Sequence, residues 1–147
     1  MPIPLTSVYF RLAQTRLARG DAAGANAMMA KADQAALHPT VTPTGRAAHA
    51  AYRVMFAIQQ DDVDGAQDWG KRLSESAVLG FLLQHVPARL LIARGEKTAA
   101  MKQLQDFYLK AEEAGAQGLI INIRVYQALA AATPAEALIF LSEALEK

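Results

Sequence analysis

The stretch Leu17–Asn26, LARGDAAGAN, is echoed by Ile92–Met101, IARGEKTAAM. Both stretches read apolar residue, Ala, Arg, Gly and acid, and both have Ala at the ninth place. Self-similarity at a regular spacing is the signature of a repeat protein. Two weaker copies occur elsewhere, and the fifth residue after the turn is alanine in all four: Ala25, Ala66, Ala100 and Ala137. These alanines lie 41, 34 and 37 residues apart, which fits helix–turn–helix repeats of about 34 residues.

The composition favours a protein built from α-helices. Apolar residues make up 52% of the 147 residues, and alanine, the best helix former, recurs throughout. β-Branched residues are sparse and scattered, so no segment reads as a clear strand. We expect one all-α domain over 1–147, with four antiparallel hairpins. Helical periodicity predicts eight helices at about 5–19, 22–36, 44–59, 63–75, 79–94, 97–114, 117–132 and 134–146.

The second helix of each copy carries an apolar stripe. In the third copy Ala100, Leu104 and Phe107 lie at i, i+4 and i+7, on one face of a helix. The small residue lets two helices approach closely, and the large residues fill the space beside it. A single hairpin cannot bury this stripe alone, so neighbouring hairpins must stack.

The turns between helices have recognisable residues. Gly20 and Gly95 suit the left-handed conformation that ends a helix. In the fourth copy we expect Thr133 to be the N-cap residue, with Glu136 closing a capping box. Pro87 falls inside the fifth expected helix, so that helix either bends there or begins only near His85.

Charge and composition argue against several classes of protein. The formal net charge of +1 gives no electrostatic case for direct nucleic-acid contact or for an anionic membrane surface. The sequence has no cysteine, which removes disulfides, thiolate nucleophiles and Cys-ligated zinc. No run of about 18 apolar residues could span a membrane, and the N-terminal segment lacks the pattern of a signal peptide. We expect a cytoplasmic protein.

Residues that often carry chemistry are not grouped as an active site requires. The three histidines lack metal-binding spacing, and the serines lack a nucleophile-elbow context. We therefore expect no metal, no cofactor and no catalytic residue. Trp69, the single tryptophan, is interpreted as a packing wedge between helices more readily than as a ligand platform.

Parts of the chain resemble known families. Ala25, Met29 and Ala32 fit the second helix of the tetratricopeptide (TPR) repeat. From about Arg46 onward, the sequence resembles large MalT-like regulators of the LuxR family. The segments that carry this resemblance are the Ala66–Trp69 pair, PARLLIARG at Pro87–Gly95, AEEAGA at Ala111–Ala116 and YQALA at Tyr126–Ala130. Pro87 replaces a family Leu, and the fourth turn is about three residues shorter.

The resemblance implies a right-handed TPR-like superhelix that acts as a sensor segment. Such regulators join a STAND-class ATPase, a TPR-like sensor and a C-terminal helix-turn-helix. This chain has no Walker A motif, so it would be the sensor segment alone, cut out of a larger regulator. The implied partner is a small-molecule effector or a protein. The alternative is a stand-alone TPR adaptor that binds a peptide. An excised array would expose apolar ends, which could drive self-association.

In TPR-like superhelices the first helix of each pair lines the concave groove. Carrying positions over by register puts Gln14, Met55, Arg89 and Tyr126 on one ring. A second ring, one turn earlier, holds Phe10, Ala51, His85 and Asn122. From these rings we expect the ligand or partner to contact Gln14, His85, Arg89, Asn122 and Tyr126.

Overall fold

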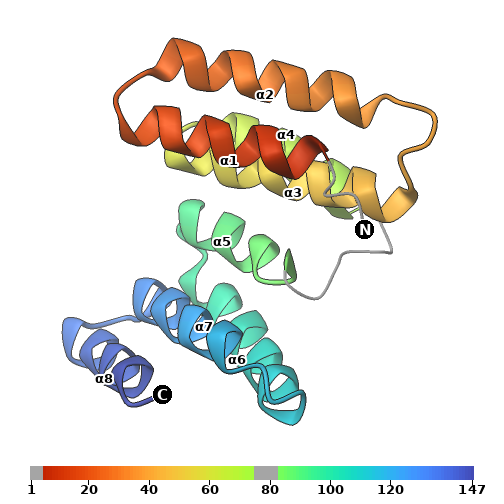
Figure 1. Ribbon diagram of the computed structural model, residues 1–147. Helices are drawn as coiled ribbons and strands as arrows, with labels where there is room; N and C mark the ends of the chain where they lie inside the picture. The colour runs from red at the N-terminus through yellow and green to blue at the C-terminus, as the bar shows by residue number, and fades with distance from the viewer. Residues whose placement is uncertain (1–4, 75–82) are drawn as a thin grey trace. The chain divides into compact units, whose positions relative to one another are not determined.

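The computed structural model describes residues 5–74 and 83–147, and all regular structure in these ranges is helical (Figure 1). This confirms the all-α prediction. The eight described helices are α1 (Leu5–Ala18), α2 (Ala22–Ala36), α3 (Pro43–Gln59), α4 (Val63–Ser74), α5 (Val86–Ala93), α6 (Lys97–Glu113), α7 (Gln117–Ala130) and α8 (Pro134–Leu145).

The helices form two compact units, an N-terminal unit over Met1–Gly80 and a C-terminal unit over Phe81–Lys147. In the N-terminal unit, α1 and α2 form one hairpin and α3 packs on both helices before pairing with α4. In the C-terminal unit, α5 pairs with α6, α7 packs on both, and α8 packs on α7. The hairpin order is as predicted, whereas the right-handed superhelix of all four hairpins stays a prediction.

Glycine in the left-handed conformation ends three of the helices. The φ angles of Gly20 and Gly95 are +78° and +79°, which confirms the prediction for both. Gly115, after α6, has a φ of +64°. In the hairpin of α3 and α4 the same role falls to Asp61, which has a φ of +56°.

Side-chain caps fix the start of several helices. The Asp21 carboxylate accepts a hydrogen bond from the Gly24 N–H at 2.8 Å, and Thr133 Oγ1 accepts one from the Glu136 N–H at 3.2 Å. Thr133 is therefore the N-cap residue of α8, as expected. The capping box differs in one bond, because the Glu136 carboxylate accepts from the N–H of Ala132 at 3.0 Å rather than from that of Thr133.

The described part of α5 begins at Val86, and Pro87 lies in its first turn. Proline is tolerated there because the first N–H groups of a helix have no partner within the helix. Of the two predicted alternatives, the start near His85 is therefore confirmed, and no bend at Pro87 is needed. The earlier part of the expected helix, 79–82, lies outside the described residues.

Three of the four repeated alanines are completely buried between helices. Ala25, Ala66 and Ala100 have no exposed surface. In the N-terminal unit Met29 and Phe56 are also fully or almost fully buried, and Phe10 stacks on Tyr52 with ring centroids 4.6 Å apart. The fourth alanine, Ala137, is only half-buried, because α8 is packed against α7 alone among the helices of its unit.

Arg124 ties the C-terminal unit together. Its guanidinium lies 3.8 Å from the ring centroid of Tyr108 on α6 and 5.7 Å from that of Phe140 on α8. It also forms an ion pair with Glu143 on α8 at 2.9 Å and donates to Gln127 Oε1 at 2.9 Å. The fully buried Gln127 in turn donates to Gln105 on α6 at 3.1 Å. One arginine on α7 therefore holds both neighbouring helices.

Candidate functional site

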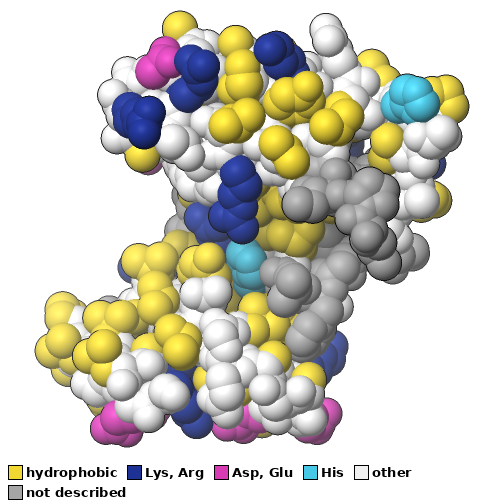
Figure 2. Space-filling model, viewed as in Figure 1, with side chains coloured by type: hydrophobic (Ala, Val, Ile, Leu, Met, Phe, Trp, Pro, Cys, Tyr) yellow, Lys and Arg dark blue, Asp and Glu magenta, His cyan; other side chains and the backbone are white. Residues whose placement is uncertain are grey.

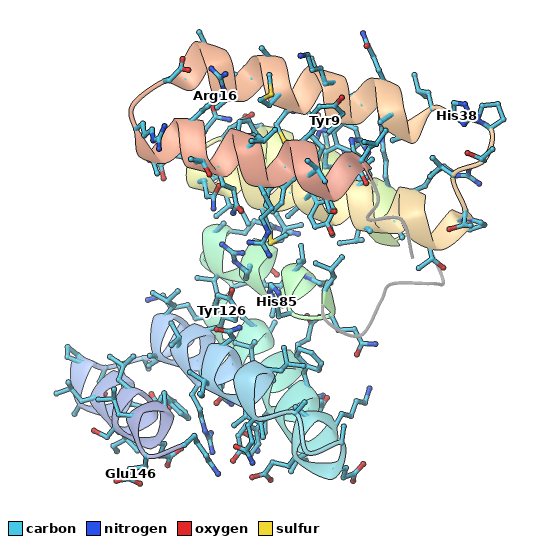
Figure 3. The ribbon with its side chains drawn as sticks, in the orientation of Figure 1. Tyr9, Arg16, His38, His85, Tyr126 and Glu146 are labelled. Atoms are coloured by element: carbon cyan, nitrogen blue, oxygen red, sulfur yellow. The ribbon has the colours of Figure 1, made fainter. Side chains whose placement is uncertain are left out.

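A cluster of two aromatic rings and a guanidinium lies between α5 and α7, the first helices of their hairpins. The imidazole of His85 stacks on the phenol ring of Tyr126, with centroids 4.9 Å apart and an interplanar angle of 19° (Figure 3). The guanidinium of Arg89, one helical turn after His85, lies 5.1 Å from the centroid of the same ring. All three side chains are half-buried. The structure therefore brings together three of the five predicted groove residues.

The imidazole of His85 is neutral at physiological pH. Burial, and to a smaller extent the positive charge of Arg89, lower its pKa to about 4. Its Nδ1 atom is buried and has no hydrogen-bond partner among the residues the structure describes. A buried polar atom without a partner is costly. A ligand that hydrogen-bonds to this nitrogen would remove that cost.

The cluster offers three kinds of contact to a polar molecule. Tyr126 provides an aromatic ring, Arg89 provides a fixed positive charge, and neutral His85 provides a hydrogen-bonding nitrogen. This combination of apolar surface with a few polar groups is typical of ligand sites.

No contact of the other two predicted groove residues, Asn122 and Gln14, with this cluster is seen among the described residues. Asn122 lies on α7 one turn before Tyr126, and it is exposed. Gln14 belongs to the N-terminal unit, where its Oε1 accepts a hydrogen bond from Arg11 at 3.4 Å. Its place on the same surface as Arg89 stays a prediction.

Three members of the predicted rings, all in the N-terminal unit, are buried. Phe10, Ala51 and Met55 have at most 6% of their surface exposed, so they cannot line an open groove. Phe10 faces Tyr52 of the following hairpin. The register carried over from TPR repeats therefore identifies core positions in this unit rather than ligand contacts.

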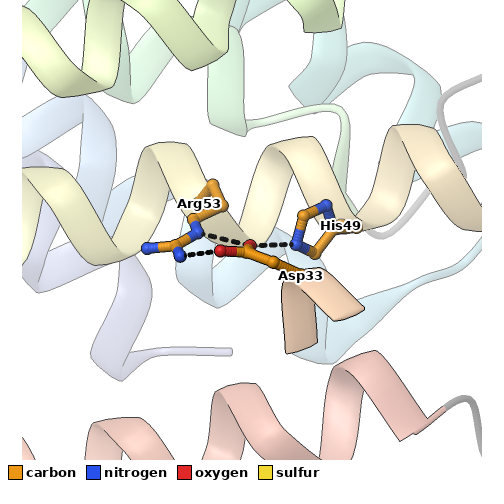
Figure 4. A network of polar contacts seen from close by, with 3 residues as sticks. All are labelled: Asp33, His49 and Arg53. Atoms are coloured by element: carbon orange, nitrogen blue, oxygen red, sulfur yellow. Dashed lines mark hydrogen bonds and ion pairs between the residues drawn. The ribbon is translucent and has the colours of Figure 1, made fainter. Parts of the chain in front are cut away.

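A second polar cluster, which the sequence analysis missed, joins α2 to α3. The carboxylate of Asp33 accepts hydrogen bonds from Arg53 Nε and His49 Nε2, each at 2.8 Å, and also pairs with Arg53 Nη2 (Figure 4). A carboxylate can only accept here, so Nε2 of His49 carries the proton. Asp33 thus links two side chains that lie one turn apart on α3.

Opposing effects set the charges in this cluster. Burial raises the pKa of Asp33, but the hydrogen bonds and charges of Arg53 and His49 outweigh it and leave the pKa below its usual value. Burial lowers the pKa of His49 and Asp33 raises it, and with the positive charges of Arg53 and Arg72 the pKa stays below its usual value. At neutral pH the cluster therefore contains a carboxylate, a guanidinium and a neutral imidazole.

Trp69 of α4 completes the cluster as a packing residue. Its ring meets the His49 ring edge-on, with centroids 5.3 Å apart, and lies 4.2 Å from the Arg72 guanidinium. A cavity of about 270 Å³ beside it is lined by Asn26, Arg53, Phe56, Ala57, Gln60, Asp62, Gly65 and Trp69. These contacts fit the interpretation of Trp69 as a wedge between helices.

The sequence held part of the signal for this cluster. His49 and Arg53 are four residues apart and must share a helix face. Asp33 is the one acidic residue within the preceding helix. Nothing in the sequence indicates that its side chain faces His49 and Arg53, because that depends on how the two hairpins pack.

The described residues show neither a metal-binding group nor a membrane-spanning helix. Among the described residues, no group of three or more His, Cys, Asp or Glu side chains could share a metal ion. No helix in the described ranges is both long enough and apolar enough to cross a bilayer. Comparisons of the chain with known protein families, with curated proteins and with solved structures give no match.

Proposed function

We propose that this protein is a non-catalytic binding module, and that its C-terminal unit binds a polar effector or a partner protein beside His85, Arg89 and Tyr126. In the fuller form of the proposal, the module is the sensor segment of a MalT-like LuxR-family transcription regulator. The sequence resemblance over Pro87–Gly95 and Tyr126–Ala130 supports that identity. Both segments belong to the helices that carry the cluster.

The observation that carries the proposal is the unpartnered nitrogen of His85 within an aromatic and cationic cluster. The stack on Tyr126 orients the imidazole, and the Arg89 guanidinium lies 5.1 Å from the centroid of the same ring. A ligand with a ring or sugar face and a carboxylate or hydroxyl group would satisfy all three contacts. Such a ligand would be held by α5 and α7 together, so its binding would favour one arrangement of these two helices.

Binding can be tested by thermal-shift measurements with a panel of oligosaccharides, nucleotides and small carboxylic acids. A pulldown with a peptide library, carried out in parallel, tests for binding of peptides. We expect at least one class to bind, and Arg89→Ala and Tyr126→Ala to weaken that binding about tenfold or more, equivalent to ~1.4 kcal/mol. Lys110→Ala is the matched control, since Lys110 is an exposed cation in the last turn of α6.

The outcomes separate the alternatives. Binding of a small molecule supports a sensor, whereas binding of peptides alone supports the stand-alone adaptor. If ligands bind the wild-type chain and Arg89→Ala binds them equally well, the site is elsewhere and the proposal fails.

A further inference from the structure

The surface of the last hairpin is strongly apolar. Ile121, Val125 and Leu129 recur every four residues along α7, and Leu138, Leu141 and Leu145 form a second stripe along α8. We call these six residues the end face. They are 36% to 89% exposed, and hydrophobic side chains gather over α8 and the adjoining part of α7 (Figure 2, lower left).

The internal repeat shows that two residues of the end face, Val125 and Leu141, occupy positions that are covered in the earlier hairpins. Subtracting 37, 71 and 112 from a residue number gives the matching positions in the earlier hairpins, as the four repeated alanines show. The positions that match Val125 are Ala88, Val54 and Ala13, which are at most 1% exposed, whereas Val125 is 39% exposed.

In α8, the second helix of the last hairpin, Leu141 is likewise more exposed than the residues at its matching positions. Leu141 is 39% exposed. Its matching positions, Leu104, Gly70 and Met29, are all buried. At these two positions the last hairpin therefore keeps apolar residues where the earlier hairpins are covered, although each is 39% exposed. Large uncovered apolar patches mark interaction sites.

The outer surface of α1 is more polar than the end face. Ile120, Ile123 and Gln127 of α7 are buried where this helix packs on α5 and α6, and their matching positions in α1 are Val8, Arg11 and Thr15. All three α1 residues are exposed, and two of them are polar. A head-to-tail contact between copies would bury the charge of Arg11 against the end face, whose six residues include no acid.

The end face is, by contrast, suited to a copy of itself. It contains no charged residue, and the nearby Glu143 is already paired with Arg124 at 2.9 Å. The exposed parts of the six residues amount to on the order of 600 Å², against about 800 Å² per partner in a standard protein–protein interface. Polar residues at the rim would supply the remainder.

We propose that two copies of this chain associate through the end face, α7 and α8 of one copy against α7 and α8 of the other, around a two-fold axis. Isologous pairing places identical apolar patches together and closes the assembly at a dimer. This inference uses none of the three side chains of the site proposed beside His85, so it can fail without that proposal failing.

Analytical ultracentrifugation of the whole chain over about a hundredfold range of concentration tests the proposal. We expect a reversible monomer–dimer equilibrium. Leu141→Glu and Leu145→Lys each place a charge in the end face, and each should weaken dimerisation at least about tenfold. Leu145 is 89% exposed in the last turn of α8, so its replacement leaves the fold intact. Circular dichroism checks that both variants are helical.

Leu12→Glu is the matched control, because Leu12 is 45% exposed on α1 and lies outside the end face. This variant should dimerise like the wild type. A wild-type chain that is monomeric throughout the concentration range overturns the proposal, as does open-ended polymerisation. Dimerisation that survives Leu145→Lys but is lost in Leu12→Glu would place the contact elsewhere and also overturn it.

Discussion

At the scale of single residues, His49 and His85 differ in how their ring nitrogens are hydrogen-bonded. His49 is buried at the hairpin contact and donates to Asp33, so its hydrogen-bonding role is filled. His85 stacks on Tyr126 but keeps a buried nitrogen without a partner among the described residues. The first arrangement is that of a structural residue, and the second supports the binding role that we propose for His85. Sequence spacing identified His85 and Arg89 as sharing a face, but it could not reveal that unpartnered nitrogen.

The pKa of His85 predicts how stability depends on pH. The unfolded chain binds a proton at His85 below about 6.5, whereas the folded chain does so only below about 4. The unfolded state therefore holds more protons in this window, and the free energy of unfolding falls as the pH falls from about 6.5 to about 4. The low pKa of His49 acts in the same direction.

We expect His85→Gln to reduce this loss of stability in acid. The limit for one proton is about 1.4 kcal/mol per pH unit, and we expect less because solvent reaches the half-buried ring. Urea unfolding followed by circular dichroism at several pH values would measure the slope. An equally steep slope in the variant would show that His85 is not shielded as the structure indicates.

At the scale of helices, the sequence predicted ends and starts better than packing. Gly20 and Gly95 end their helices because glycine adopts positive φ without steric cost. Thr133 starts α8 through a local hydrogen bond. These signals depend on a few neighbouring residues. The TPR register placed Met55 and Phe10 on the surface of a groove, and this placement was wrong. The orientation of a helix depends on contacts with distant segments, which the register does not contain.

Glycine replacements test the turns. Gly95→Ala should destabilise the protein by about 1–2 kcal/mol, because alanine in the left-handed region is strained. A Cβ atom there would meet nothing within 4 Å, so the cost lies in the backbone alone. Gly118→Ala, inside α7 and equally uncrowded, should stabilise by up to about 1 kcal/mol. Urea unfolding would measure both changes, and equal effects would contradict this account of the turns.

At the scale of the whole molecule, the repeat explains both the fold and its exposed end. The spacing of the four alanines predicted the order of the hairpins, which the structure confirms within each unit. It could not predict that Ala137 differs from the other three, because burial depends on whether another helix covers the position. The end face is exposed for the same reason, since no further helix of the C-terminal unit is seen to cover α8 in the described residues. The proposed binding site follows from Tyr126 and Arg89 meeting on neighbouring first helices.

The central claim is that each repeated alanine marks a close contact that a neighbouring helix completes. The most direct test compares Ala100→Met with Ala137→Met in the same unit, by the free energy of unfolding in urea. Ala100 has no exposed surface, so Met there should cost about 1–3 kcal/mol through overpacking. Half-buried Ala137 should accept Met at a cost below about 0.5 kcal/mol. Equal costs at the two positions would contradict the claim.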